Sequence, residues 1–312
     1  MPQVSPLFYA GFLSFVALML ALDLGVFHRK AHTPSAREAG AWTIVWSSLA
    51  AAFGGFVWLQ FGSSAALDYY TAWLIEQSLS IDNIFVFVVI FAALRIPPEL
   101  QHRVLFWGVL SAVVLRAVMI FGGVWLIEHF QPVLYAFGAL LLITGLKLVA
   151  RGTHDDLSTA ESRAVGWLRR RIRSTDQLHG QRFFVRQDGR LRATPLFLAL
   201  LLVEGSDVVF AVDSIPAVFG VTTDPFLVFT SNIFAILGLR SLFFLLAGMA
   251  GKFAYLKPAL GIVLGFVGLK LVAHSVVKVP TLVSLTVIVV VIGGGILLSI
   301  VRPGTAARAH GA

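Results

Sequence analysis

Long apolar runs separated by short polar breaks dominate this sequence. Several runs reach about 20 residues, the length that a helix needs to cross a hydrocarbon core of roughly 30 Å. We therefore predict an all-α polytopic membrane protein with about nine transmembrane helices. The predicted spans lie near residues 6–27, 40–61, 69–94, 104–127, 131–150, 195–219, 225–248, 254–273 and 280–301.

The connections between these runs carry basic residues in alternation. Arg29, Lys30 and Arg37 follow the first run, and ten arginines lie between Arg151 and Arg192. The intervening connections, at residues 62–68, 128–131 and 220–224, hold no lysine or arginine. Because basic loops stay in the cytoplasm, the pattern predicts an inner-membrane protein with its N-terminus outside and its C-terminus inside.

Composition narrows the class of function. Hydrophobic residues make up 58% of the 312 positions and charged residues 13%, which excludes an ordinary soluble domain. The absence of cysteine excludes thiolate metal ligands and thiol redox chemistry. The net charge of +8 resides largely in the cytoplasmic loops, so membrane orientation explains it and no nucleic-acid partner is expected.

The loop 151–194 is the longest polar segment between spans. It combines ten basic with five acidic residues and a few aromatics such as Phe183 and Phe184. These apolar residues are too few for a separate core. We predict that the segment lies at the inner membrane surface, where its arginines meet anionic lipid headgroups.

An internal repeat divides the chain. The hexapeptide Gly-Leu-Lys-Leu-Val-Ala occurs at 145–150 and again at 268–273, and an arginine precedes each copy by a similar distance, Arg116 and Arg240. Further back, Asp82-Asn83-Ile84 matches Asp213-Ser214-Ile215, and Glu76 matches Asp207. The predicted organisation is two N-terminal helices in 1–68, a three-helix repeat in 69–150, the basic loop 151–194, a second three-helix repeat in 195–273, and a final helix with the C-terminal tail in 274–312.

Each repeat holds an odd number of spans, so the second crosses the membrane in the opposite sense. Inverted repeats of this kind are the architecture of many secondary transporters, with the substrate near the bilayer midplane. The repeat therefore favours transport over catalysis, and no enzymatic activity is expected.

Six acids fall inside predicted spans, although a central aspartate costs about 2.5–3.5 kcal/mol on insertion scales. Metal binding or ion pairing is the usual resolution of such a cost. Five of the six lie in the repeat-related spans. The six are Asp23, Glu76, Asp82, Glu204, Asp207 and Asp213.

Helical geometry separates these acids into faces. Glu76, Ser80 and Asn83 share one face, and Glu204 shares a face with Asp207. Asp82 and Asp213 would point away on straight helices. Either they bind something different, or the helices break between the acids, a possibility that Pro216 favours in the second copy.

Carboxylate, amide and hydroxyl oxygens are hard ligands that suit Mg²⁺, Ca²⁺ or Mn²⁺, whereas zinc and copper sites usually contain Cys or His. An anionic substrate is disfavoured because five acids would repel it. Arg116 and Arg240 could neutralise the acids, as structural ion-pair partners or as gating elements, and protons could serve as counter-ions. We expect the metal as a transported substrate and no permanently bound cofactor.

Three stretches carry a family resemblance. They are Glu76 to Asn83, Val203 to Pro216, and Thr230 to Arg240. With these the chain resembles the TerC family of membrane proteins, including its Alx-type members, over nearly its whole length. The resemblance implies manganese export from the cytoplasm, with Glu76, Asp82, Glu204, Asp207 and Asp213 as ion ligands and Asn83 and Asn232 as neutral partners.

Other functions remain to be weighed against a manganese exporter. A transporter could carry another hard divalent cation such as Ca²⁺. A membrane scaffold that supports metal or tellurium resistance, or membrane-protein assembly, would act through the basic loop and would tolerate neutralised acids. An intramembrane aspartyl protease is disfavoured, because the chain has no Gly-x-Gly-Asp motif.

Overall fold

The structure is a computed structural model, and nearly all of the chain that it describes is helical. The described residues are 4–22, 35–151, 166–168, 170–172, 174–175, 177–187, 190–247, 255–273 and 279–301. The helices are α1 (Pro6–Leu22), α2 (Ala36–Phe61), α3 (Ser63–Ala93), α4 (Pro98–His129), α5 (Val133–Arg151), α7 (Pro195–Phe219), α8 (Pro225–Leu246), α9 (Leu256–Val272) and α10 (Thr281–Val301). Two short strands, β1 (Phe184–Gln187) and β2 (Arg190–Ala193), form a hairpin.

Seven of the described helices are long and apolar enough to cross a membrane: α2, α3, α4, α5, α7, α8 and α10. Helices α1 and α9 are apolar but contain only 17 residues each. The described chain is therefore a mostly helical membrane protein, as its apolar runs predict. The count of nine spans stays a prediction.

Local sequence signals explain several helix ends. Ser35 caps α2 by accepting a hydrogen bond from the backbone N–H of Glu38, and Asp224 caps α8 in the same way for Phe226 and Leu227. Proline occupies the first turn of α4, α7 and α8, where its missing N–H costs nothing. Between α2 and α3, Gly62 adopts a positive φ of 88°, which L side chains rarely adopt.

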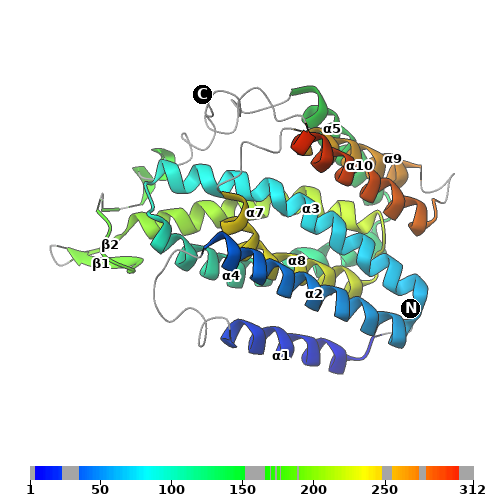
Figure 1. Cartoon of the computed structure of the whole chain (residues 1–312), viewed down its shortest axis with the longest axis horizontal. Helices are drawn as coiled ribbons and strands as arrows, with labels where there is room; N and C mark the ends of the chain where they lie inside the picture. The colour runs from blue at the N-terminus through cyan, green and yellow to red at the C-terminus, as the bar shows by residue number, and fades with distance from the viewer. Residues whose placement is uncertain are drawn as a thin grey trace.

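The centre of the molecule is a bundle of α3, α4, α7 and α8. Each of α3 and α4 packs against both α7 and α8. The apolar stretch of α8 is buried along its whole length, which marks it as the central helix. Figure 1 shows these helices running in the long direction of the molecule, with α2 against one side and α1 outside it.

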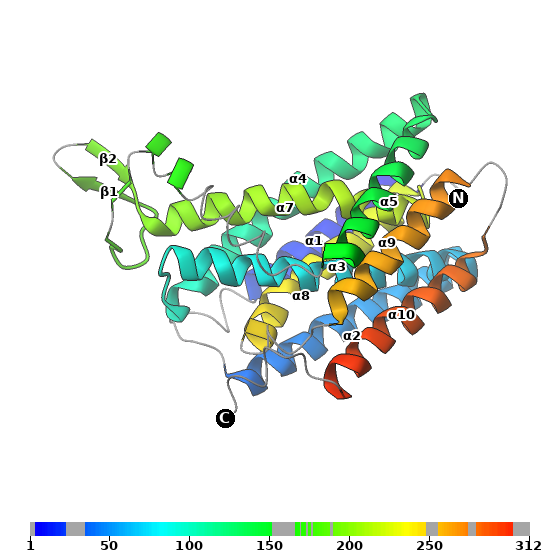
Figure 2. The ribbon, with the colours of Figure 1, turned by 90° about the horizontal axis from the view of Figure 1, so that it is seen from above.

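A second group, α5, α9 and α10, lies across one side of this bundle, on the half away from the hairpin, as Figure 1 and Figure 2 show. Glycines let α5 and α9 approach closely. A Cβ on Gly138 would lie 2.9 Å from the carbonyl oxygen of Gly268, and one on Gly145 would lie 2.6 Å from that of Gly261. The backbones of the two helices are therefore in contact at two points.

Polar contacts join this second group to the bundle. The Thr281 hydroxyl donates to Asp68 at the start of α3 (2.8 Å), and the Lys270 amino group donates to the buried Ser284 (3.0 Å). From its position near the end of α9, Lys270 could have extended toward the membrane surface instead. It therefore makes a specific contact between α9 and α10.

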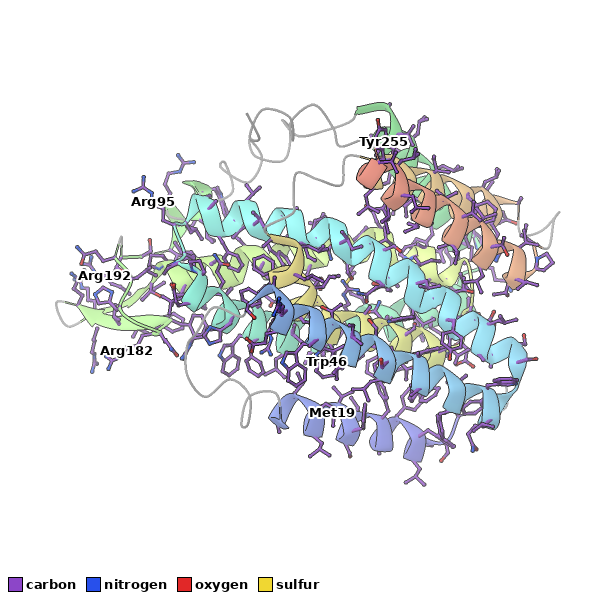
Figure 3. The ribbon with its side chains drawn as sticks, in the orientation of Figure 1. Met19, Trp46, Arg95, Arg182, Arg192 and Tyr255 are labelled. Atoms are coloured by element: carbon purple, nitrogen blue, oxygen red, sulfur yellow. The ribbon has the colours of Figure 1, made fainter. Side chains whose placement is uncertain are left out.

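The β-hairpin is an element that the apolar pattern did not predict. Its strands pair Phe184 with Ala193 and Gln187 with Arg190. It projects from the end of the bundle where α7 begins, and Figure 3 places Arg95, Arg182 and Arg192 at this same end. The basic loop thus contains ordered structure rather than only an amphipathic surface segment.

The break expected at Pro216 is absent. Helix α7 continues through Pro216 to Phe219, and α3 is likewise continuous from Ser63 to Ala93. Pro216 lies in the last turn of α7, which ends at Phe219. The backbone hydrogen bond that proline cannot donate is therefore lost only near the end of the helix, and the helix before it stays intact. Neither helix is therefore broken between its acids, and the alternative, that Asp82 and Asp213 bind something different, stays a prediction.

Candidate functional site

Arg116 is the centre of a buried polar cluster in the four-helix bundle. It lies on α4, and its side chain is only 1% exposed. Its Nη1 donates to Glu76 Oε2 on α3 at 2.6 Å and to Asn232 Oδ1 on α8 at 3.0 Å. Its Nη2 and Nε donate to the two carboxylate oxygens of Asp207 on α7, at 2.8 and 3.2 Å. All four helices of the bundle therefore meet at one guanidinium group.

The contacts around Arg116 depend on the planar, several-donor guanidinium group of arginine. The planar guanidinium binds Asp207 with two parallel hydrogen bonds, an arrangement that a lysine cannot reproduce. The second acid, Glu76, is wholly buried. The three charged groups carry a formal charge of −1, so the cluster holds one more carboxylate than cation.

Several polar side-chain atoms on α3, α7 and α8 have no hydrogen-bond partner among the described residues. These atoms are buried, and leaving such an atom unpaired is costly. Both carboxylate and amide groups are represented, so oxygen ligands and N–H donors are available together. The atoms are Glu76 Oε1, Ser80 Oγ, Glu204 Oε2, Ser214 Oγ and Asn232 Nδ2.

Glu204 lies one helical turn before Asp207 on α7 and is half-buried. Its Oε1 accepts a hydrogen bond of 2.5 Å from the hydroxyl of Ser111 on α4. A small cavity of about 20 Å³ is lined by Glu204, Asp207 and Arg240, together with apolar residues that include Leu105 and Val203. Leu105 and Val203 precede Arg116 and Asp207 in helices that start at the hairpin end, so the cavity lies on the hairpin side of Arg116.

Asp213 lies apart from Arg116. Its Oδ1 accepts a long hydrogen bond, 3.4 Å, from the Thr144 hydroxyl on α5. This placement agrees with the helical geometry, which puts Asp213 and Asp207 on different faces of α7. Asp82 is on α3, but its side chain is outside the described part of the structure, and Asp23 lies outside the described residues altogether.

The remaining predicted residues are buried close to the acids along the chain. Asn83 is 3% exposed and Ser80 is 1% exposed, both on α3 after Glu76. Across the described residues, no three Asp, Glu or His side chains lie close enough together to hold a metal ion. The structure thus unites Glu76, Asp207, Asn232 and Arg116, and places Glu204 and Asp213 at separate positions.

Two hydroxyl residues in contact with the acids were missed from the sequence. Ser111 and Thr144 each bond a carboxylate of α7 from a different helix. Each is the one serine or threonine of its predicted span, and this was the signal that the sequence offered. A serine or threonine in a span also bonds its own helix backbone, as Ser111 does to Trp107, so this signal is weak.

Comparisons with known proteins agree on one family. Residues 61–306 match the model of the integral membrane protein TerC family. An uncharacterized membrane protein of Myxococcus xanthus, STKORF319, is 56% identical over 298 residues, covering 96% of this chain and 93% of its own. The Escherichia coli K12 protein named membrane-bound redox modulator Alx is 47% identical over 293 residues, covering 91% of each chain.

A membrane protein of Rickettsia bellii is 40% identical over 291 residues, which cover 93% of this chain and 96% of its own. No solved structure matches the chain. The family match covers well over half of the chain, and these relatives align along nearly their whole lengths. The chain therefore belongs to the TerC family of integral membrane proteins.

Proposed function

We propose that this protein is a secondary transporter that exports Mn²⁺ from the cytoplasm in exchange for protons. One observation carries the proposal: Glu76 and Asp207, which occupy equivalent positions in the two sequence repeats, converge in the buried centre of the four-helix bundle. Acids inside a membrane protein are costly and are found mainly where ions or protons pass.

The proposal includes an inverted repeat, and the glycine contacts between α5 and α9 support it. The 123 positions that separate Lys147 from Lys270 also separate Gly138 from Gly261 and Gly145 from Gly268. Exchanging the two repeats therefore turns the Gly138–Gly268 contact into the Gly145–Gly261 contact. A two-fold axis between the repeats explains this reciprocity, and such an axis would bring equivalent acids together at the midplane.

The chemistry of the cluster favours a hard divalent cation. Two carboxylates, the Asn232 amide oxygen and nearby hydroxyls are the ligand types that Mn²⁺, Mg²⁺ and Ca²⁺ prefer. Arg116 already bonds three of the four carboxylate oxygens of Glu76 and Asp207. A divalent cation bound to both acids must therefore displace the guanidinium, so the arginine competes with the substrate.

We assign the remaining acids to the same path. Glu204, with its free Oε2, lies between Asp207 and the hairpin side of the bundle and is placed to receive the cation first. Asp213, held by Thr144, lies on a different face of α7 and is a candidate carrier of the exchanged proton. Asp82 and Asn83 complete the ligand set on α3.

Orientation follows from the same proposal. Arg95, Arg182 and Arg192 gather at one end of the molecule (Figure 3), which we assign to the cytoplasm by the positive-inside tendency. The protein then lies in the inner membrane with its N-terminus outside and its C-terminus inside. We further propose that exposed hairpin residues such as Arg182 and Arg186 contact anionic lipid headgroups.

The name of the Alx relatives, membrane-bound redox modulator, raises a second possibility. This chain has no cysteine, so it cannot carry out thiol redox chemistry itself. We propose that any redox influence is indirect and acts through the concentration of the metal that it exports.

The test is Mn²⁺ uptake into inverted membrane vesicles, or into proteoliposomes with the purified protein, with a pH-sensitive dye inside. The wild type should take up Mn²⁺ as protons leave. Glu76→Gln and Asp207→Asn should lower the rate by about tenfold or more, because each removes a ligand charge at a buried site. Glu128→Gln, an exposed acid near the end of α4, serves as the matched control.

Asp213→Asn tests the assignment of the proton carrier. It should lower proton-coupled uptake more than it lowers Mn²⁺ binding, because Asp213 lies outside the Arg116 cluster. A correctly folded wild type that moves no Mn²⁺, Ca²⁺ or Mg²⁺ would overturn the transporter and favour a membrane scaffold that acts through the basic loop.

A further inference from the structure

Arg116 poses a problem for a transporter built on Glu76 and Asp207. Its guanidinium occupies the acids in the arrangement described here, yet a divalent substrate needs the same oxygens. After the substrate leaves, the two carboxylates must again be neutralised, because burying both without a cation would be costly. Some positive group must therefore neutralise the acid pair while the access to the pair changes from one side of the membrane to the other.

The sequence repeat supplies a second arginine for this purpose. Arg240 on α8 is the counterpart of Arg116 on α4. It lines the small cavity that also borders Asp207 and Glu204, on the hairpin side of the cluster. Arg240 lies eight residues beyond Asn232 on the same helix, which is about 12 Å along the helix axis. One arginine therefore holds the acid pair, while its counterpart lines a cavity that also reaches the same aspartate from the hairpin side.

Inverted repeats exchange their conformations when a transporter changes the side to which it opens. Helices α4 and α8 are equivalent, and so are Glu76 and Asp207. Exchanging the roles of the repeats consequently moves Arg240 onto the acid pair and withdraws Arg116. This exchange replaces Glu76 by Asp207 and Asp207 by Glu76, so the pair stays the same. It can therefore bind either arginine in turn.

We propose that Arg116 and Arg240 are alternating internal cations: Arg116 neutralises the Glu76–Asp207 pair in the arrangement described here, and Arg240 neutralises it in the oppositely facing one. This inference rests on the proposed transport function and assigns Arg240, together with Arg116, to the return step that follows release of the substrate. When both arginines are withdrawn, the pair is free to bind one divalent cation.

Two modes of transport separate this role from a structural one. Net Mn²⁺ uptake into empty proteoliposomes requires the return step. Exchange of internal unlabelled Mn²⁺ for external radioactive Mn²⁺ does not require it, because the loaded protein crosses in both directions. Arg116→Gln and Arg240→Gln should each lower net uptake by about tenfold or more and lower exchange by a much smaller factor.

Lys147→Gln is the matched control, since it removes one positive charge from an exposed position on α5. It should leave both modes unchanged. If a glutamine variant does not fold, the lysine variants Arg116→Lys and Arg240→Lys carry the test. Lysine keeps the charge but not the two-pronged bond to an acid. Net uptake should therefore again fall selectively, but by less than tenfold, because the charge that neutralises the acids remains.

Four other results of the two transport measurements would overturn the proposal. Equal loss of both modes would identify the arginines as structural, and loss of neither mode would show that protons alone neutralise the acids; each would overturn the proposal. A selective effect at only one arginine would also overturn the alternation. A wild type inactive in both modes would instead overturn the transport function, and this inference with it.

Discussion

Arg116 joins four helices through one side chain, so its contribution to stability depends on its partners. A buried ion pair often adds little compared with an apolar core, but removing one partner leaves an uncompensated charge. Here the arginine is the cation shared by Glu76 and Asp207, and each acid is buried. The cluster therefore couples the stability of the bundle to the presence of a positive charge at its centre.

We expect Arg116→Leu to lower the free energy of unfolding by roughly 3–5 kcal/mol, because two buried carboxylates lose their counter-charge together. The measurement is unfolding of the purified protein in detergent, followed by helical circular dichroism. Adding Mn²⁺ should recover part of the loss, since a divalent cation can neutralise the same two acids.

The control is a triple variant that also carries Glu76→Gln and Asp207→Asn. With the acids neutral, the leucine no longer leaves charges unpaired, so the triple variant should be more stable than Arg116→Leu alone and should not respond to Mn²⁺. A single variant as stable as the wild type would show that water or other groups already satisfy the acids.

At the scale of residues, the sequence identified the acids and candidate partners for them, but not which of these groups meet. Glu76 and Asp207 were selected because acids in apolar spans are costly, and Arg116 because the repeat contains it twice. Their convergence depends on how α3, α4 and α7 cross, which a single helix period does not encode. The separation of Asp213 from Asp207 was predictable, because the two residues lie six positions apart on one continuous helix and therefore on different faces of it.

At the scale of elements, the contact between α5 and α9 depends on the absence of side chains. The glycines are seven residues apart on each helix, so they lie on one face and face each other twice. No hydrophobic force drives apolar helices together in lipid, and close packing supplies much of the association instead. The two glycine pairs therefore set the distance between the repeats at this point.

Gly145→Ala should destabilise the protein by roughly 1–3 kcal/mol, because the new methyl group would overlap the backbone of α9 at Gly261 and Gly265. Thermal unfolding in detergent measures the effect. Gly265→Ala is the matched control: a Cβ there meets nothing within 4 Å. The control should be neutral or slightly stabilising, since alanine favours helix.

Equal effects of the two substitutions would contradict the close approach of α5 and α9. The glycine pairs also offer a test of the repeat. Gly268→Ala, at the position equivalent to Gly145, meets Gly138 O at 2.8 Å and should cost a similar amount.

The helices were predictable because the length of their apolar runs determines them. The hairpin was not predicted, because only a short turn signal in the sequence marks it. The long helices follow from apolar runs that must satisfy their backbone hydrogen bonds internally. The hairpin has strands of only four residues, with Asp188-Gly189 between them in the sequence. That pair is a strong hairpin signal, but the arginines on both sides obscured the alternation of apolar and polar residues.

At the scale of the whole molecule, orientation decides whether the proposed transporter exports or imports. The hairpin end carries Arg95, Arg182 and Arg192, and α1 begins at the opposite end (Figure 1). Basic residues resist transfer across the inner membrane. The hairpin should consequently face the cytoplasm, and Glu204, on the hairpin side of Asp207, should face the supply of cytoplasmic Mn²⁺.

Single cysteines can measure this orientation without background, because the chain has no cysteine of its own. Gln187→Cys lies in the hairpin and Ser64→Cys at the start of α3, and both positions are exposed. A membrane-impermeant maleimide should label Ser64→Cys in intact cells and Gln187→Cys only after the membrane is opened. The reverse pattern would place the hairpin outside, so that the same acids would face external metal first. The basic end of the molecule would then lie outside the cell, and Glu204 could not receive cytoplasmic Mn²⁺ first. That result would rule out export by this path, even if the site binds Mn²⁺.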